Sequence, residues 1–132
     1  MKIIAIAIAA TLFSLLLATN LHAQKCATWK GGTPGRTTDW NCASNWKEGR
    51  VPNEFSSVII PDVSTTTGYH PSIASNVEAI SSLQVLPGAS LTIAESGALE
   101  VLNWTQVSNA TQIVIAGYLT INSTVAVFEK GK

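Results

Sequence analysis

The chain has 132 residues, of which 46% are hydrophobic and 12% charged, and its 8 Lys and Arg side chains balance its 8 Asp and Glu side chains. This length suits a single domain. The sequence has no basic patch and no run of like charges, so we do not expect nucleic acid as a partner.

Residues 1–23 form a predicted secretory signal peptide. Lys2 precedes an almost wholly apolar stretch from Ile3 to Ala18, and Leu21-His22-Ala23 has the small-residue ending that signal peptidase accepts. A membrane anchor is the alternative, but the apolar stretch is short against the ~20 residues of a span, and the cleavage site follows at once. We therefore expect a protein that is secreted or held at the cell surface, with no membrane span after cleavage.

Cys26 and Cys42 are the only two cysteines of the chain. Export into an oxidising compartment predicts a disulfide between them, with two free thiols as the alternative. The bond would close a loop of about 15 residues and stabilise the fold by ~3 kcal/mol. The two thiols and His70, a lone side chain that we expect to be exposed, are too few for a zinc site. We expect no metal and no cofactor.

A Trp-rich segment opens the exported chain, with Trp29, Trp40 and Trp46 close together in sequence. Indole offers a large apolar area and one N–H donor. The cluster is therefore either a sugar-stacking platform or a hydrophobic cap on the end of a strand array. Turn formers such as Asp39 and Asn45 flank the indoles, which favours the cap.

Residues 24–79 are assigned to this cap and to a connector. Ser57 to Ile60 is a predicted strand, which Pro61 ends. In the Ser/Thr-rich connector that follows, Ile73 and Val77 are the expected buried anchors.

Residues 80–132 are predicted to be repeats of short, half-buried strands, because apolar and polar residues alternate in triplets. The triplets begin, at spacings of 8, 8, 14, 6 and 6, at Leu83, Leu91, Leu99, Ile113, Leu119 and Val125. Leu91 and Ile93 are expected to point inward and Thr92 outward. Corners are expected at glycines, where a side chain would collide or φ is positive; they are Gly88, Gly97 and Gly117.

The longest interruption of the repeats lies between Val101 and Ile113, and it holds the candidate binding residues Asn103, Trp104 and Gln106. Trp104 either folds back over the edge of the strands or is an exposed aromatic with amides around it. Exposed aromatics of this kind are typical of sugar sites.

The N-terminal segment carries a longer signature. It reads Thr28-Trp29-x-Gly31, then Thr38-Asp39-Trp40-Asn41-x-x-x-Asn45-Trp46-x-x-Gly49-x-Val51-Pro52, then Val58-x-Ile60-Pro61, and later Gly88-Ala89-Ser90-Leu91-Thr92-Ile93. Over residues 27–127 the chain resembles secreted repeat proteins of Bacteroidetes-type bacteria. The resemblance implies an extracellular β-solenoid segment of surface or adhesin-type proteins, and it is tied to no single activity.

The triplets together predict an all-β fold, a short right-handed parallel β-helix or solenoid with the Trp-rich segment as its N-terminal cap. The alternative is an antiparallel β-sandwich, in which the 6- and 8-residue spacings are hairpins. No cap is visible after Val127, so we expect that end to self-associate or to carry further repeats.

The sequence favours a structural or adhesive surface module without catalytic activity, and the alternative is a carbohydrate-binding module that contacts extracellular glycans. A glycosidase needs two carboxyl groups that face one cleft. Glu95 and Glu100 are the only close pair in the repeats, and they flank Gly97, which places them on different faces of a coil. No Ser-His-Asp or Cys-His pairing is evident.

Overall fold

The computed structural model describes residues 25–107, 112–122 and 126–127. The predicted signal peptide and Val125 lie outside these residues. The elements in chain order are β1 (Lys25–Thr28), the 3₁₀ helix η1 (Ala43–Asn45), β2 (Ser56–Ile60), β3 (Ser72–Ile73), β4 (Ile80–Val85), β5 (Leu91–Ile93), β6 (Ala98–Val107), β7 (Ile113–Ile115), β8 (Tyr118–Ile121) and β9 (Ala126–Val127). No helix formed by the described residues is long and apolar enough to cross a membrane.

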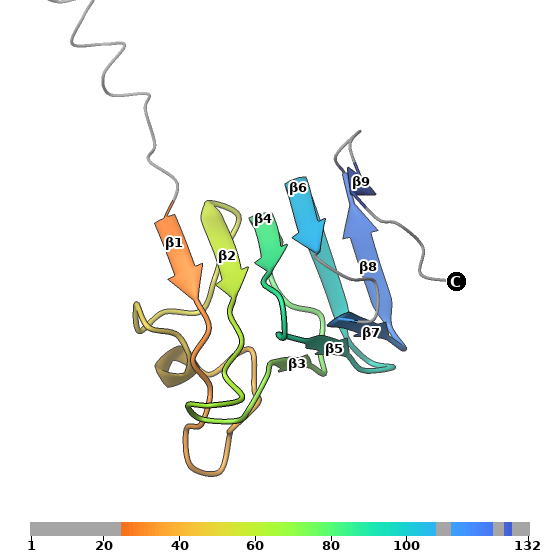
Figure 1. The fold of residues 1–132 in the computed structure, drawn as a ribbon. Helices are drawn as coiled ribbons and strands as arrows, with labels where there is room; N and C mark the ends of the chain where they lie inside the picture. The colour runs from red at the N-terminus through yellow and green to blue at the C-terminus, as the bar shows by residue number, and fades with distance from the viewer. Residues whose placement is uncertain (1–24, 108–111, 123–125, 128–132) are drawn as a thin grey trace, which may run out of the picture.

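The strands form two sheets, and every pairing between named strands is parallel (Figure 1). The larger sheet has the order β1-β2-β4-β6-β8, with β9 also paired to β6, and the smaller one has the order β3-β5-β7. The antiparallel sandwich is therefore wrong. The short spacings do not make hairpins, because they carry the chain from one sheet to the other: β5 and β6 are neighbours in sequence but lie in different sheets.

The register repeats along the chain. From β3 onward, paired residues lie 20 to 22 positions apart, as in Ile73 with Ile93 and Ile93 with Ile115. We call each stretch of 20 to 22 residues that visits both sheets once a pass. Equivalent residues of successive passes thus stack on one another. The predicted orientation of β5 is confirmed, because Leu91 and Ile93 are fully buried and Thr92 is exposed.

Glycines mark the corners for the two physical reasons that the sequence suggested. A Cβ on Gly117 would collide with the carbonyl oxygens of Gly97 and Ala94, and a Cβ on Gly97 would collide with that of Ile73. The corner at Gly117 therefore lies directly against the corner at Gly97. Gly88 instead has a φ of +82°, which L side chains rarely adopt.

The predicted interruption after Val101 is placed wrongly. β6 continues from Ala98 to Val107, so Asn103, Trp104 and Gln106 lie in a strand and not in a loop. The reason is pairing with the preceding pass: β4 binds β6 on both sides of a register shift between Ile80 and Ser82. One extra β6 residue at this bulge breaks the apolar alternation, and in the sequence this break resembles a loop.

The core is continuous from the Trp-rich segment to β7. It contains the predicted anchors Ile73 and Val77 together with the inward residues of β2, β4, β5 and β6. Leu119 and Ile121 of β8 pack against it but are only partly buried.

Candidate functional site

The three N-terminal indoles are interior side chains. Trp29, Trp40 and Trp46 are buried, and the ring of Trp46 stands edge-on to the other two at centroid distances of 5.1 Å and 4.8 Å. Trp29 donates its Nε1–H to the carbonyl oxygen of Tyr69, and Trp46 donates to that of Trp40. Because their faces are covered by protein, these rings offer no platform on which a sugar could stack.

The same segment binds the outer edges of both sheets. The amide of Lys47 donates to the carbonyl of Thr28, the last residue of β1, at 2.9 Å. At the smaller sheet, the Ser72 amide of β3 donates to the Thr38 carbonyl at 2.8 Å, and the Trp40 amide donates to Ser72. In Figure 1 this segment lies at the β1 end of the molecule, away from β8 and β9.

Asn45 holds the segment together from inside. Its side chain is fully buried. Its Nδ2 donates to the carbonyls of Arg36 and Asp39 at 2.6 and 3.0 Å, and its Oδ1 accepts from the Thr33 amide at 3.0 Å. All three partners are backbone groups, so the amide joins residues 33–39 to the 3₁₀ helix η1.

The two cysteines are free thiols in this structure, so the predicted Cys26–Cys42 disulfide is not formed. Cys26 is exposed on β1, where its neighbour Ala27 takes the inward position. Cys42 is buried in the Trp-rich segment, and its Sγ lies 3.2 Å from the Ser44 hydroxyl. This hydrogen bond lowers the pKa of the Cys42 thiol. The two side chains are directed to different surroundings, which sequence separation alone does not reveal.

His70 is half-buried, whereas the sequence suggested an exposed side chain. Its Nε2 accepts weakly from the Val63 amide at 3.4 Å and lies 3.8 Å from Asp62 Oδ1. A hydrogen bond from Ser64 is the main cause that lowers the pKa of Asp62, with a smaller contribution from His70. His70 thus contacts the start of the loop after β2, at Asp62 and Val63. Among the described residues no group of three His, Cys, Asp or Glu side chains is placed to hold a metal.

A cavity of about 250 Å³ separates the Trp-rich segment from the loop after β2. Trp29, Pro61 and Val63 give it a mainly apolar lining, and Lys30 and Lys47 stand at the same cavity. Asp62, Thr66 and Thr67 complete its lining.

The surface with the best features for a ligand is the outer face of the larger sheet, which we call the Trp104 face. Two rows of register-paired residues cross it. The first row is Cys26, Ser57, Ser82 and Trp104, and the second is Thr28, Ile59, Gln84 and Gln106. None of these eight side chains is charged, and the exposed Glu100 lies farther along β6, where this strand pairs with β8.

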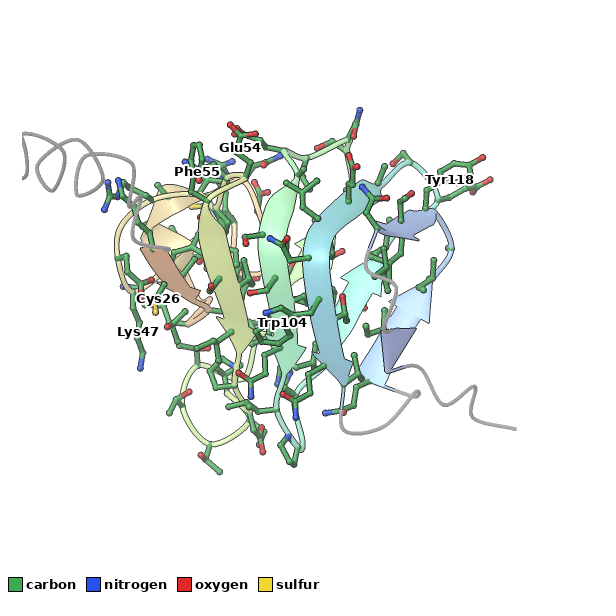
Figure 2. The ribbon with its side chains drawn as sticks, turned by 90° about the horizontal axis from the view of Figure 1, so that it is seen from above. Cys26, Lys47, Glu54, Phe55, Trp104 and Tyr118 are labelled. Atoms are coloured by element: carbon green, nitrogen blue, oxygen red, sulfur yellow. The ribbon has the colours of Figure 1, made fainter. Side chains whose placement is uncertain are left out.

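Trp104 is 42% exposed on this face, so of the two interpretations offered by the sequence the structure shows the exposed aromatic. Figure 2 shows it between Cys26 at one end of the molecule and Tyr118 at the other. Beside Trp104, the hydroxyl of Ser82 is buried and has no hydrogen-bond partner. An exposed ring beside small polar residues is an arrangement that binds sugars in other proteins.

The structure brings two of the three predicted binding residues together. Gln106 lies on the same face as Trp104, paired with Gln84 of β4, which sequence reasoning missed. Asn103 sits at the bulge, where its Nδ2 donates to the Ser81 hydroxyl at 2.7 Å. Its amide is therefore committed to the preceding pass. The sequence did hold a signal for Gln84: it is the polar middle residue of the triplet Leu83-Gln84-Val85, so the alternation predicts that it faces outward.

Glu95 and Glu100 lie in different parts of the repeat. Glu100 projects from β6 and accepts a hydrogen bond from Asn122 Nδ2 at 2.6 Å, while Glu95 lies in the exposed corner between β5 and β6. The Glu100 carboxylate thus joins β6 to Asn122 of the next pass.

These observations define a nearly all-β protein of parallel strands, closed at one end by a Trp-rich segment and bearing the exposed Trp104 on the outer face of its larger sheet. Residues 28–125 match a family model described as a domain of unknown function, DUF8693, and the chain belongs to that family. The matched span covers the Trp-rich segment, the connector and the stacked strands. The chain matches no curated protein and no solved structure.

Proposed function

We propose that the chain is a short right-handed parallel β-solenoid that serves as an exported structural or adhesive module of the cell surface, without a catalytic role. The repeating register of 20 to 22 residues is the observation that carries this proposal. A chain that alternates between two parallel sheets at a constant repeat has the form of a coil. Parallel crossover connections are right-handed in roughly 98% of cases, which supports that hand.

The polar groups of the chain support a structural role. Buried Asn45 and Gln112 bond backbone carbonyls, and Asn103, Asn122 and Glu100 link one pass to the next. These side chains are used to hold the stack together. The resemblance to secreted Bacteroidetes-type repeat proteins supports export, as does the apolar N-terminal stretch.

Export is tested with the full chain expressed in a Gram-negative host. We expect the N-terminus of the product to be Gln24 and the protein to be accessible to protease on intact cells. Beads coated with residues 24–132 should then adhere to bacterial surface material more strongly than beads coated with an unrelated β protein. Cytoplasmic product with residues 1–23 still attached would contradict the export, and equal adhesion would contradict the adhesive role.

A second candidate function, carbohydrate binding, is favoured by the Trp104 face. The exposed ring lies beside the paired Gln84 and Gln106, and the surrounding rows carry no charge. A neutral polysaccharide could stack a sugar on Trp104 and bond its hydroxyls to the amides.

A glycan array with residues 24–132 tests this function. We expect binding to neutral glycans that weakens roughly tenfold or more in Trp104→Ala, because one stacking contact is lost. Tyr118→Ala is the matched control, since Tyr118 is also an exposed aromatic but lies on β8, away from the two rows. Wild-type protein that binds no neutral glycan, or equal loss in both variants, would rule out the Trp104 face.

A further inference from the structure

The cavity between the Trp-rich segment and the loop after β2 lies at the carboxyl ends of two neighbouring parallel strands. Trp29 and Lys30 follow directly after β1, and Pro61, Asp62 and Val63 follow directly after β2. The cavity shares no residue with the two rows of the Trp104 face. It is therefore a separate candidate for a ligand.

The two walls of the cavity are joined to each other by hydrogen bonds. The Thr67 hydroxyl donates to the Lys30 carbonyl at 2.6 Å, and the Trp29 Nε1–H donates to the Tyr69 carbonyl at 2.8 Å. The backbones also meet at Gly31, where a Cβ would collide with the Tyr69 carbonyl oxygen. These contacts hold the cavity open in one shape, as is usual for small-molecule sites.

The interior of the cavity is apolar and its mouth carries two lysines. Trp29 and Val63 are buried, whereas Lys30 and Lys47 are exposed. No salt bridge joins either ammonium to a carboxylate of the described residues. Because a lysine carries its charge on a flexible stem, both ammonium groups can reach over the mouth.

The acidic side chains near these lysines have other partners. Asp62, which also lines the cavity, accepts from the Ser64 amide at 2.9 Å and lies 3.8 Å from His70 Nε2. Glu48, the neighbour of Lys47, accepts from the Thr28 amide at 2.8 Å and lines a different, smaller pocket. The mouth of the cavity therefore has an excess of positive charge, which complements an anion.

We propose that this cavity binds a small organic carboxylate with one apolar ring. The ring occupies the interior beside Trp29, Pro61 and Val63, and the carboxylate pairs with Lys30 and Lys47 at the mouth. The volume of about 250 Å³ is just below the ~300–1,000 Å³ of sites for drug-sized molecules, which suits a ligand of a single ring. An inorganic anion would leave the apolar interior unfilled. This site is additional to the proposed structural role and does not depend on it.

A nuclear magnetic resonance titration of residues 24–132 with phenylacetate as the probe tests the proposal. The indole N–H signal of Trp29 should shift in a saturable way, with a Kd of about 1 mM or tighter, and that of Trp104 should not move. Phenylacetamide, which has nearly the same shape without the charge, should bind roughly fivefold or more weakly. Inorganic phosphate should leave the Trp29 signal in place.

Lys30→Gln combined with Lys47→Gln should weaken phenylacetate binding roughly fivefold or more, because both charge contacts are lost. The matched control combines Lys25→Gln with Arg50→Gln. It removes the same charge from exposed residues that line the smaller pocket, and it should change the affinity less than about twofold. Circular dichroism confirms the fold of each variant.

A Trp29 signal that phenylacetate does not move overturns the site, and so does a shift of Trp104 alone. Equal weakening by the two double variants, or equal affinity for phenylacetate and phenylacetamide, overturns the role of the two lysines. The comparison of phenylacetate with phenylacetamide uses the wild type, so it decides that role even if a double variant fails to fold.

Discussion

At the scale of single residues, Asn45 is the side chain on which the Trp-rich segment depends. Its one amide satisfies three backbone groups of residues 33–39 from inside the loop. A buried polar group left without a partner costs about 1–3 kcal/mol. The sequence predicted only a turn role for Asn45. It missed the contacts with Thr33, Arg36 and Asp39, because a turn needs only a local contact.

We expect Asn45→Ala to lower the free energy of unfolding by roughly 2–4 kcal/mol, since it strands more than one buried backbone group. Urea denaturation measures the change. Asn41→Ala is the control: Asn41 lies in the same segment, is exposed, and uses its Nδ2 only for the Ser75 hydroxyl. It should cost less than about 1 kcal/mol. Similar losses in both variants would show that Asn45 has no special role.

The cysteines give a second prediction at this scale. Cys26 is exposed and Cys42 is buried. In native residues 24–132 a thiol reagent should therefore label Cys26 quickly and Cys42 only after denaturant is added, because access controls the reaction. Cys26→Ser should remove the fast phase and keep the slow one. If the protein instead has a mass two hydrogens below that of the dithiol form, and no thiol reacts in denaturant, Cys26 and Cys42 are joined in a disulfide.

At the scale of elements, β5 shows how alternation fixes the two faces of a strand. Leu91 is buried among the passes on either side, while Thr92 faces solvent. We expect Leu91→Ala to cost about 2–5 kcal/mol in unfolding free energy, because it opens a cavity between stacked strands. Thr92→Ala should stay within about 0.5 kcal/mol. Thermal and urea unfolding compare the two, and a larger loss for Thr92→Ala would reverse the orientation of β5.

β6 shows the limit of the same reasoning. Its alternation is broken near Asn103 by the bulge against β4, although the strand itself continues to Val107. The break can be read as a loop from the sequence, because a bulge is defined by the partner strand. Trp104 therefore changes from a loop residue to an outward residue of a sheet, next to Gln106 and Gln84.

At the scale of the whole molecule, the core joins the Trp-rich segment to the stacked strands in one cluster. We therefore expect both parts to unfold in one cooperative transition. In a Trp104→Phe background, Trp fluorescence reports Trp29, Trp40 and Trp46, while far-ultraviolet circular dichroism reports the strands. The two midpoints in urea should coincide. A fluorescence transition at a lower urea concentration would show that the segment is a separate unit.

The sequence by itself determined the properties that depend on near neighbours along the chain. Alternation placed Leu91 and Ile93 inside and Thr92 outside, and glycines marked the corners. Flanking turn formers favoured an interior role for the three N-terminal indoles, which the structure buries. A strand's faces follow from its own residues, since side chains alternate with period two.

Only the tertiary structure decided the properties that depend on the next pass, 20 to 22 residues away. It made the pairing parallel, continued β6 through its bulge, separated Cys26 from Cys42 and brought Gln84 beside Gln106. Ile93 and Ile115 have the same local pattern, and only Ile93 is buried. The physical reason is that burial depends on whether another layer covers a residue, and the triplet in which it lies carries no information about that layer.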